Sequence, residues 1–99
     1  MTPLKSAERA KIDEIVERVK QQHHRIVHQI RWELDRDWSL NFRVVWRDNA
    51  TRGKRLFRRS AMITIAIREK LEPLELDLFS YFNFRSESEQ AELREPSWA

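Results

Sequence analysis

The first third of the chain has the hydrophobic period of an α-helix. Apolar side chains recur about every 3.6 residues, at Ile12, Val16, Val19, Ile26, Ile30 and Leu34. No glycine or proline interrupts the segment after Pro3, and charged residues of both signs occupy its other faces. The pattern predicts one amphipathic helix over residues 4–34.

A helix of that length is long for a domain of this size. At a rise of about 1.5 Å per residue it would measure about 45 Å, whereas a 100-residue globule is roughly 30–35 Å across. Either the helix breaks near Gln21-Gln22-His23-His24, or a second copy of the chain covers the overhang. Because nothing in that segment breaks a helix strongly, we predict a homodimer formed through the N-terminal helix.

From Trp38 onward the hydrophobic period changes to two. Apolar and polar residues alternate over residues 38–46, which predicts a strand with one buried face. Residues 55–68 contain Ile63-Thr64-Ile65-Ala66-Ile67, whose β-branched side chains favour a second strand. A helix through 57–71 is the competing interpretation. After a turn that ends at Pro73, residues 74–84 alternate again and predict a third strand.

These elements predict an α+β protein with one domain over residues 1–99. The long helix, about 4–34, would pack on a three-stranded antiparallel β-meander, about 38–85. Ser86-Glu87-Ser88-Glu89 is typical of a helix start, so the tail over 86–99 is expected to be a short helix or disordered.

The composition bears on disulfides, metal sites and membrane association. The 99 residues contain no cysteine, so we expect neither disulfides nor a thiolate metal site. Residues 1–20 hold no apolar stretch of the kind found in signal peptides or membrane spans, so no membrane association is expected. We expect a soluble, cytoplasmic protein.

Positive charge is concentrated in the middle of the sequence. Residues 38–72 carry nine basic and three acidic residues, whereas residues 73–99 carry two basic and six acidic ones. Residues 52–59 hold five cations and the only glycine, at the predicted end of a hairpin. The basic residues that could neutralise phosphates are Arg43, Arg47, Arg52, Lys54, Arg55, Arg58 and Arg59. The alternatives are a solvated hairpin end and pairing with the acidic tail.

The second face of the predicted sheet is another candidate surface. The residues expected to share it are Arg43, Val45, Arg47, Thr64, Phe79, Tyr81 and Arg85. Aromatic and arginine side chains on an open sheet can stack on exposed bases. The same residue types are enriched in protein interfaces, and a third alternative is a small second core under the tail.

Catalytic and metal chemistry have little support. His24 and His28 would lie one helical turn apart, which is a metal-ligand spacing, but Lys20 and Arg31 beside them would repel a cation. His23 is expected to pack beside the apolar stripe. There is no cysteine nucleophile and no serine in a nucleophile-elbow context. We therefore expect no enzyme activity, no metal and no cofactor.

The pattern favours a small non-enzymatic binding protein whose basic hairpin contacts nucleic acid. The alternative is a protein–protein interaction module, such as an inhibitor, adaptor or assembly factor of a bacterium or mobile element. Such a module would dock its sheet face and hairpin on an acidic partner surface. A third possibility is a structural subunit that uses the long helix as its contact.

Overall fold

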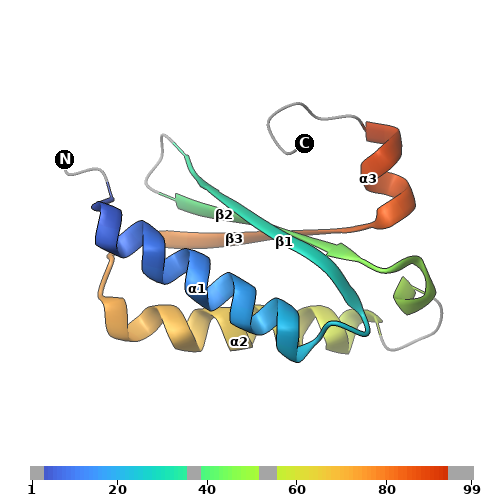
Figure 1. Ribbon diagram of the computed structural model, residues 1–99, viewed down its shortest axis with the longest axis horizontal. Coiled ribbons are helices and arrows are strands. Elements are labelled where there is room, and N and C mark those ends of the chain that lie inside the picture. The colour runs from blue at the N-terminus through green and yellow to red at the C-terminus, as the bar shows by residue number, and fades with distance from the viewer. Residues whose placement is uncertain (1–3, 36–38, 52–55, 94–99) are drawn as a thin grey trace.

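The computed structural model describes residues 4–35, 39–51 and 56–93, and it has two layers. Figure 1 shows a three-stranded sheet with two long helices covering the same face of it. A third, shorter helix lies at one end of the sheet. The predicted α+β class is confirmed. The elements are α1 (Ser6–Gln22), β1 (Val27–Leu34), β2 (Ser39–Trp46), η1 (Asp48–Thr51), α2 (Leu56–Leu71), η2 (Glu72–Leu74), β3 (Phe79–Ser86) and α3 (Glu87–Leu93).

The sheet is mixed, so the predicted antiparallel meander is wrong. The strand order is β1-β2-β3, in which β1 is antiparallel and β3 is parallel to β2. Phe42 in the middle of β2 pairs with Trp32 on β1 and with Phe82 on β3. A parallel pair requires a crossover connection, and α2 forms it between β2 and β3.

The predicted helix over 4–34 is wrong in its second half. Helix α1 ends at Gln22, and β1 begins at Val27 after the turn that the alternative interpretation placed near His23. In that second half Ile30, Trp32 and Leu34 alternate with polar residues, and the three contribute to the core. The helical spacing of the apolar residues there was coincidental. A helix of 17 residues does not overhang the domain, so the argument for a dimer through the N-terminal helix no longer holds.

The second predicted strand, over 55–68, is also wrong. These residues belong to α2, as the competing interpretation over 57–71 proposed. Ile63 and Ile67 are buried whereas Ile65 is exposed, which is the pattern of a helix and not of a strand. Burial of this one face against the sheet overrides the β propensity of the isoleucines.

The core lies between the sheet and the two long helices. Two aromatic pairs join β2 to β3 there: Phe42 stacks on Phe82 at 4.9 Å between ring centroids, and Trp46 stacks on Phe84 at 5.4 Å. The buried core residues are Ile12, Val16, Val19, Val27, Ile30, Leu40, Phe42, Val44, Trp46, Ile63 and Ile67. Every second residue of β2 from Leu40 onward therefore faces the helices, and the intervening residues face the other side.

The turn after α2 contains a residue whose replacement is expected to stabilise the fold. Glu75 has φ 48° and ψ 46°, and its N–H donates to the carbonyl of Glu72 at 3.1 Å. The left-handed conformation is strained for a residue with a Cβ and relaxed for glycine. We expect Glu75→Gly to raise the free energy of unfolding by about 0.5–1 kcal/mol and the melting temperature by a few degrees. Glu72→Gly, at a helical position, should lower both, and equal melting temperatures for the two variants would contradict this account.

Candidate functional site

The sheet face opposite the helices is the candidate site, and it is called the open face here. Side chains alternate between the two faces of a strand, so the register of the three strands assigns its members. Arg31 on β1 lies opposite Arg43 on β2, and Arg43 pairs with Asn83 on β3. The open face consists of Gln29, Arg31, Glu33, Ser39, Asn41, Arg43, Val45, Phe79, Tyr81, Asn83 and Arg85.

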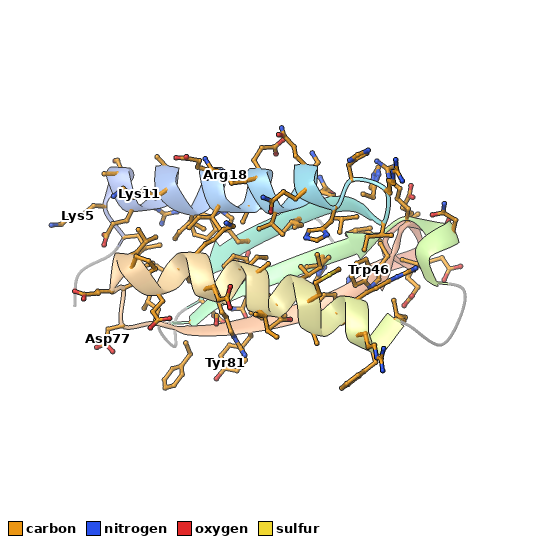
Figure 2. The ribbon with its side chains drawn as sticks, turned by 90° about the horizontal axis from the view of Figure 1, so that it is seen from below. Lys5, Lys11, Arg18, Trp46, Asp77 and Tyr81 are labelled. Carbon is orange, nitrogen blue, oxygen red and sulfur yellow. The ribbon has the colours of Figure 1, made fainter. Side chains whose placement is uncertain are left out.

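Two aromatic side chains of β3 are prominent on this face. Phe79 is 72 % exposed and Tyr81 is 54 % exposed, although Phe82 and Phe84 of the same strand pack against the core. Figure 2 shows Tyr81 projecting from the β3 side of the molecule, away from α1. Exposed aromatic rings two residues apart on one strand are typical of an interaction surface.

The open face also carries three arginines, although the residues paired with Phe79 and Tyr81 are Ser39 and Asn41. Arg43 is buried at 5 % exposure, whereas Arg31 and Arg85 are partly exposed. Arg31 and Arg43 are directly opposite each other across β1 and β2, an arrangement of like charges that costs stability. With its amide oxygen turned toward Arg31, Gln29 accepts hydrogen bonds from Nη2 at 3.1 Å and from Nε at 2.9 Å. Arg85 Nη1 donates to Gln90 Oε1 at 3.5 Å. The hydrogen bonds to Gln29 fix the position of the Arg31 guanidinium on the open face. A guanidinium held in this way suits binding of an anion.

The structure brings together some of the predicted site residues and separates others. Arg43, Phe79 and Tyr81 share the open face. Thr64, which was expected there, lies on α2 in the other layer, so that prediction is wrong. Arg52, Lys54 and Arg55 lie outside the described residues, and Arg58 and Arg59 occupy the first turn of α2.

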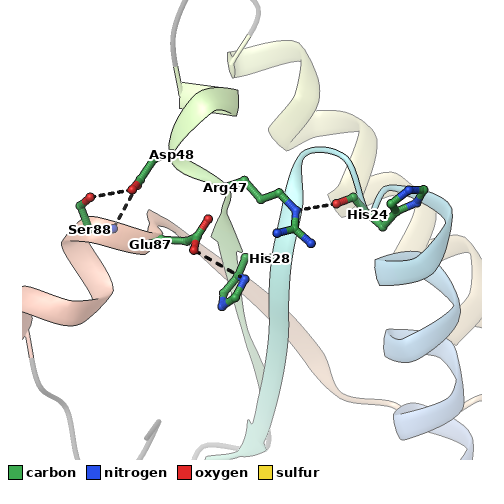
Figure 3. A network of polar contacts seen from close by, with 6 residues as sticks. All are labelled: His24, His28, Arg47, Asp48, Glu87 and Ser88. Carbon is green, nitrogen blue, oxygen red and sulfur yellow. Dashed lines mark hydrogen bonds and ion pairs between the residues drawn. The ribbon is translucent and has the colours of Figure 1, made fainter.

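Arg47 has a structural contact at the end of β2. Its Nε donates to the carbonyl oxygen of His24 at 2.6 Å (Figure 3). Its backbone N–H donates to the carbonyl of Ile26 at 2.8 Å. These bonds hold the turn between α1 and β1 against the sheet. Arg47 therefore stabilises the turn, in addition to any contact with a partner.

Polar contacts of α3 attach it to the end of the sheet at which β2 ends and β1 begins (Figure 3). Asp48 accepts hydrogen bonds from the N–H of Ser88 at 3.1 Å and from its hydroxyl at 2.8 Å. Ser86 and Glu89 form a capping box, in which the Ser86 hydroxyl accepts from the N–H of Glu89 and a Glu89 carboxylate oxygen accepts from the N–H of Ser86. The predicted helix start at Ser86 is confirmed. Glu87 faces His28, with 3.7 Å between Oε2 and Nδ1.

The three histidines do not have the arrangement that their spacing suggested. His23 ends α1, His24 Nδ1 lies 3.1 Å from the Gln21 carbonyl oxygen, and His28 is on β1. His24 and His28 therefore do not lie one helical turn apart, as their spacing had predicted. Among residues 4–35, 39–51 and 56–93, no three His, Asp or Glu side chains are close enough to hold a metal ion.

Sequence reasoning missed Arg31 and Gln29 as members of the open face because residues 27–34 were assigned to the helix. The alternation of Ile30, Trp32 and Leu34 with Arg31 and Glu33 was the signal that could have identified them. None of the helices in the described part of the chain combines the length and the apolar character needed to cross a bilayer. No protein-family model matches the sequence, and comparison with curated proteins and with solved structures gave no match.

Proposed function

We propose that this chain is a small non-enzymatic protein that binds single-stranded nucleic acid on its open face. The observation that supports this proposal best is the pair of exposed rings, Phe79 and Tyr81, on the same sheet face as the partly exposed Arg31 and Arg85. Bases stack on aromatic side chains, and the positive charge of arginines attracts the phosphate backbone.

The spacing of the rings suits stacked bases. Residues i and i+2 of a strand are about 6.6 Å apart, which is about twice the 3.4 Å rise per base of a nucleic-acid strand. Successive bases can therefore reach both Phe79 and Tyr81 when the bound strand is stretched to about twice this rise per base. A base-paired duplex would not offer its base faces to these rings, so the proposal concerns single strands.

The polar residues of the same face supply the other contacts. Arg31 and Arg85, which are partly exposed, would neutralise phosphates, and the amides of Asn41 and Asn83 can donate to and accept from base edges. Glu33, near the end of β1, is the acidic residue that the register places on this face within the described strands. The contact set is therefore predominantly cationic and aromatic. Arg58 and Arg59 of the predicted basic hairpin lie on α2, in the layer on the other face of the sheet, and so do not extend this surface.

A protein partner with an acidic surface is the second candidate. Arginine, tyrosine and phenylalanine are also enriched at the centres of protein interfaces, so the same residues would serve an adaptor or an inhibitor. Capture of a specific protein from a lysate that has been treated with nuclease would favour this alternative.

A salt series with a labelled single-stranded oligonucleotide of mixed sequence tests the nucleic-acid proposal. Each phosphate contact contributes about −0.7 to the slope of log K against log salt concentration, so the two partly exposed arginines predict a slope of about −1.4. Arg31→Gln should make the slope less negative by about 0.7. Arg18→Gln is the matched control, because Arg18 is exposed on α1 in the helix layer (Figure 2).

Three results would contradict the proposal. They are no binding at low salt, an affinity that does not depend on salt, and equal effects of the two glutamine substitutions. A partner protein captured in the absence of nucleic acid, together with any of these results, would assign the open face to protein recognition.

A further inference from the structure

Strand β3 forms one edge of the sheet, and its sequence gives that edge little protection. Natural edge strands are commonly protected by lysine, proline or a bulge, but Phe79–Ser86 contains Arg85 as its one charged residue and no proline. The opposite edge, β1, carries His28, Arg31 and Glu33 and has a register shift after Val27. No other described strand pairs with the outer side of β3. This edge is therefore suited to accept another strand.

The flank of α2 next to β3 is apolar as well. Arg68 marks which flank this is, because its Nη2 donates to the Ser80 carbonyl at 3.1 Å and its guanidinium lies 5.2 Å from the Phe82 ring centroid. At about 100° per residue, Phe57, Ala61 and Ile65 lie on the same side of the helix as Arg68. Phe57 is 84 % exposed and Ile65 is 54 % exposed. The unprotected strand edge is thus continued by an exposed apolar strip of the helix layer.

We propose that two copies of this chain form a two-fold symmetric dimer through this edge. The two β3 strands would pair in antiparallel orientation and join two three-stranded sheets into one, while the apolar flanks of the two α2 helices pack on each other. Both contacts are isologous, because each copy contributes the same strand and the same helix flank.

The sequence of β3 is complementary to itself in this arrangement. A two-fold axis at Phe82 places Phe79 opposite the partner's Arg85, a pair that a cation–π contact stabilises. Tyr81 then lies opposite the partner's Asn83. Because Arg85 is the only charged residue of β3, no like charges face each other across the pair. The complementarity favours a second copy as the occupant over an unrelated strand.

The contact between Arg68 and Ser80 is compatible with this pairing. Arg68 reaches the Ser80 carbonyl from the helix side of the sheet, since it also lies over the Phe82 ring. A carbonyl oxygen has two lone pairs, so the same oxygen can accept a ladder hydrogen bond in the plane of the sheet. In the dimer the open faces of the two copies become continuous, but the pairing itself does not depend on nucleic-acid binding.

Sedimentation without nucleic acid tests the dimer. We expect the wild-type chain to dimerise at tens of micromolar and Ile65→Glu to raise the dissociation constant at least about tenfold, because it places a charge in the apolar flank. Met62→Glu is the matched control, since Met62 is also exposed on α2 but about 60° farther from Arg68 around the helix than Ile65 is. A monomeric wild-type chain at several hundred micromolar, or equal effects of the two substitutions, would overturn the proposal.

Disulfide cross-linking tests the register, because the chain has no cysteine of its own. In the double variant Tyr81→Cys/Asn83→Cys, each cysteine would lie opposite the other position of the second copy, with about 4.5–5.5 Å between Cα atoms. That distance allows a disulfide, so oxidation should give a covalent dimer. In the Tyr81→Cys variant alone, the two cysteines are diagonal neighbours about 7–8 Å apart and should not cross-link. Efficient cross-linking of the single variant, or none of the double variant, would overturn the axis at Phe82.

Discussion

Replacing Phe79 and Tyr81 together by alanine is expected to weaken the binding of a single-stranded oligonucleotide at least about thirtyfold. Stacking of one base on an aromatic side chain contributes about 1–3 kcal/mol, so loss of both rings removes about 2 kcal/mol or more, which is about thirtyfold in affinity. Both side chains are mostly exposed, so the double variant should keep its fold. Fluorescence anisotropy at constant salt measures the change.

The control for this result has to separate stacking from assembly. Phe79 and Tyr81 also belong to the proposed dimer edge, so the comparison is made with Ile65→Glu present in every protein. In that background Phe57→Ala removes a more exposed ring from α2 and should leave the affinity within about threefold. A double variant that binds as tightly as Phe57→Ala would show that the open face does not stack on bases.

Replacing Phe42 by alanine is expected to have the largest effect on stability. Phe42 is fully buried, lies at the centre of the middle strand and stacks on Phe82. Removing such a ring leaves a cavity and lowers the free energy of unfolding by about 3–5 kcal/mol. Because the total is about 5–15 kcal/mol for a domain, the variant should be close to unfolding at room temperature. The midpoint of urea denaturation measures the change.

Tyr81→Ala is the matched substitution for this second experiment. It removes a ring of similar size from the neighbouring strand, but that ring lies on the open face and is half exposed. We expect it to change the free energy of unfolding by less than about 1 kcal/mol. A loss below about 1.5 kcal/mol for Phe42→Ala would mean that the core between β2 and the helices is less tightly packed than the structure indicates.

The elements that sequence reasoning placed correctly have local signals. Strand β2 alternates from Leu40 to Val44, and the start of α3 at Ser86 follows from a capping box that involves four consecutive residues. In α2 the local signal was misleading, because isoleucines two residues apart favour a strand in isolation. Packing of Ile63 and Ile67 against the sheet outweighs that preference in the folded protein. Without a helix between the last two strands, a parallel pair could not be predicted.

The residues of the candidate site could likewise be predicted only where the sequence carries a local signal. Phe79, Tyr81 and Arg43 could be placed on one face, because alternation along their strands is visible in the sequence. Arg31 could not, since the apolar residues around it also fit a helical period. Arg31 and Arg43 are neighbours because β1 and β2 form a hairpin, and that hairpin was not predicted from the sequence.

The parallel pairing of β3 with β2 also has a consequence for the order in which the chain acquires its structure. β1 and β2 are consecutive along the chain and can pair as soon as both have emerged from the ribosome. β3 pairs Phe79 with Ser39, so it can join only after the intervening helix has been synthesised and folded back. Until then the nascent hairpin exposes the edge of β2 with which β3 later pairs. Contacts between residues so distant along the chain form slowly, and this interval is the period in which the nascent chain is most exposed to aggregation.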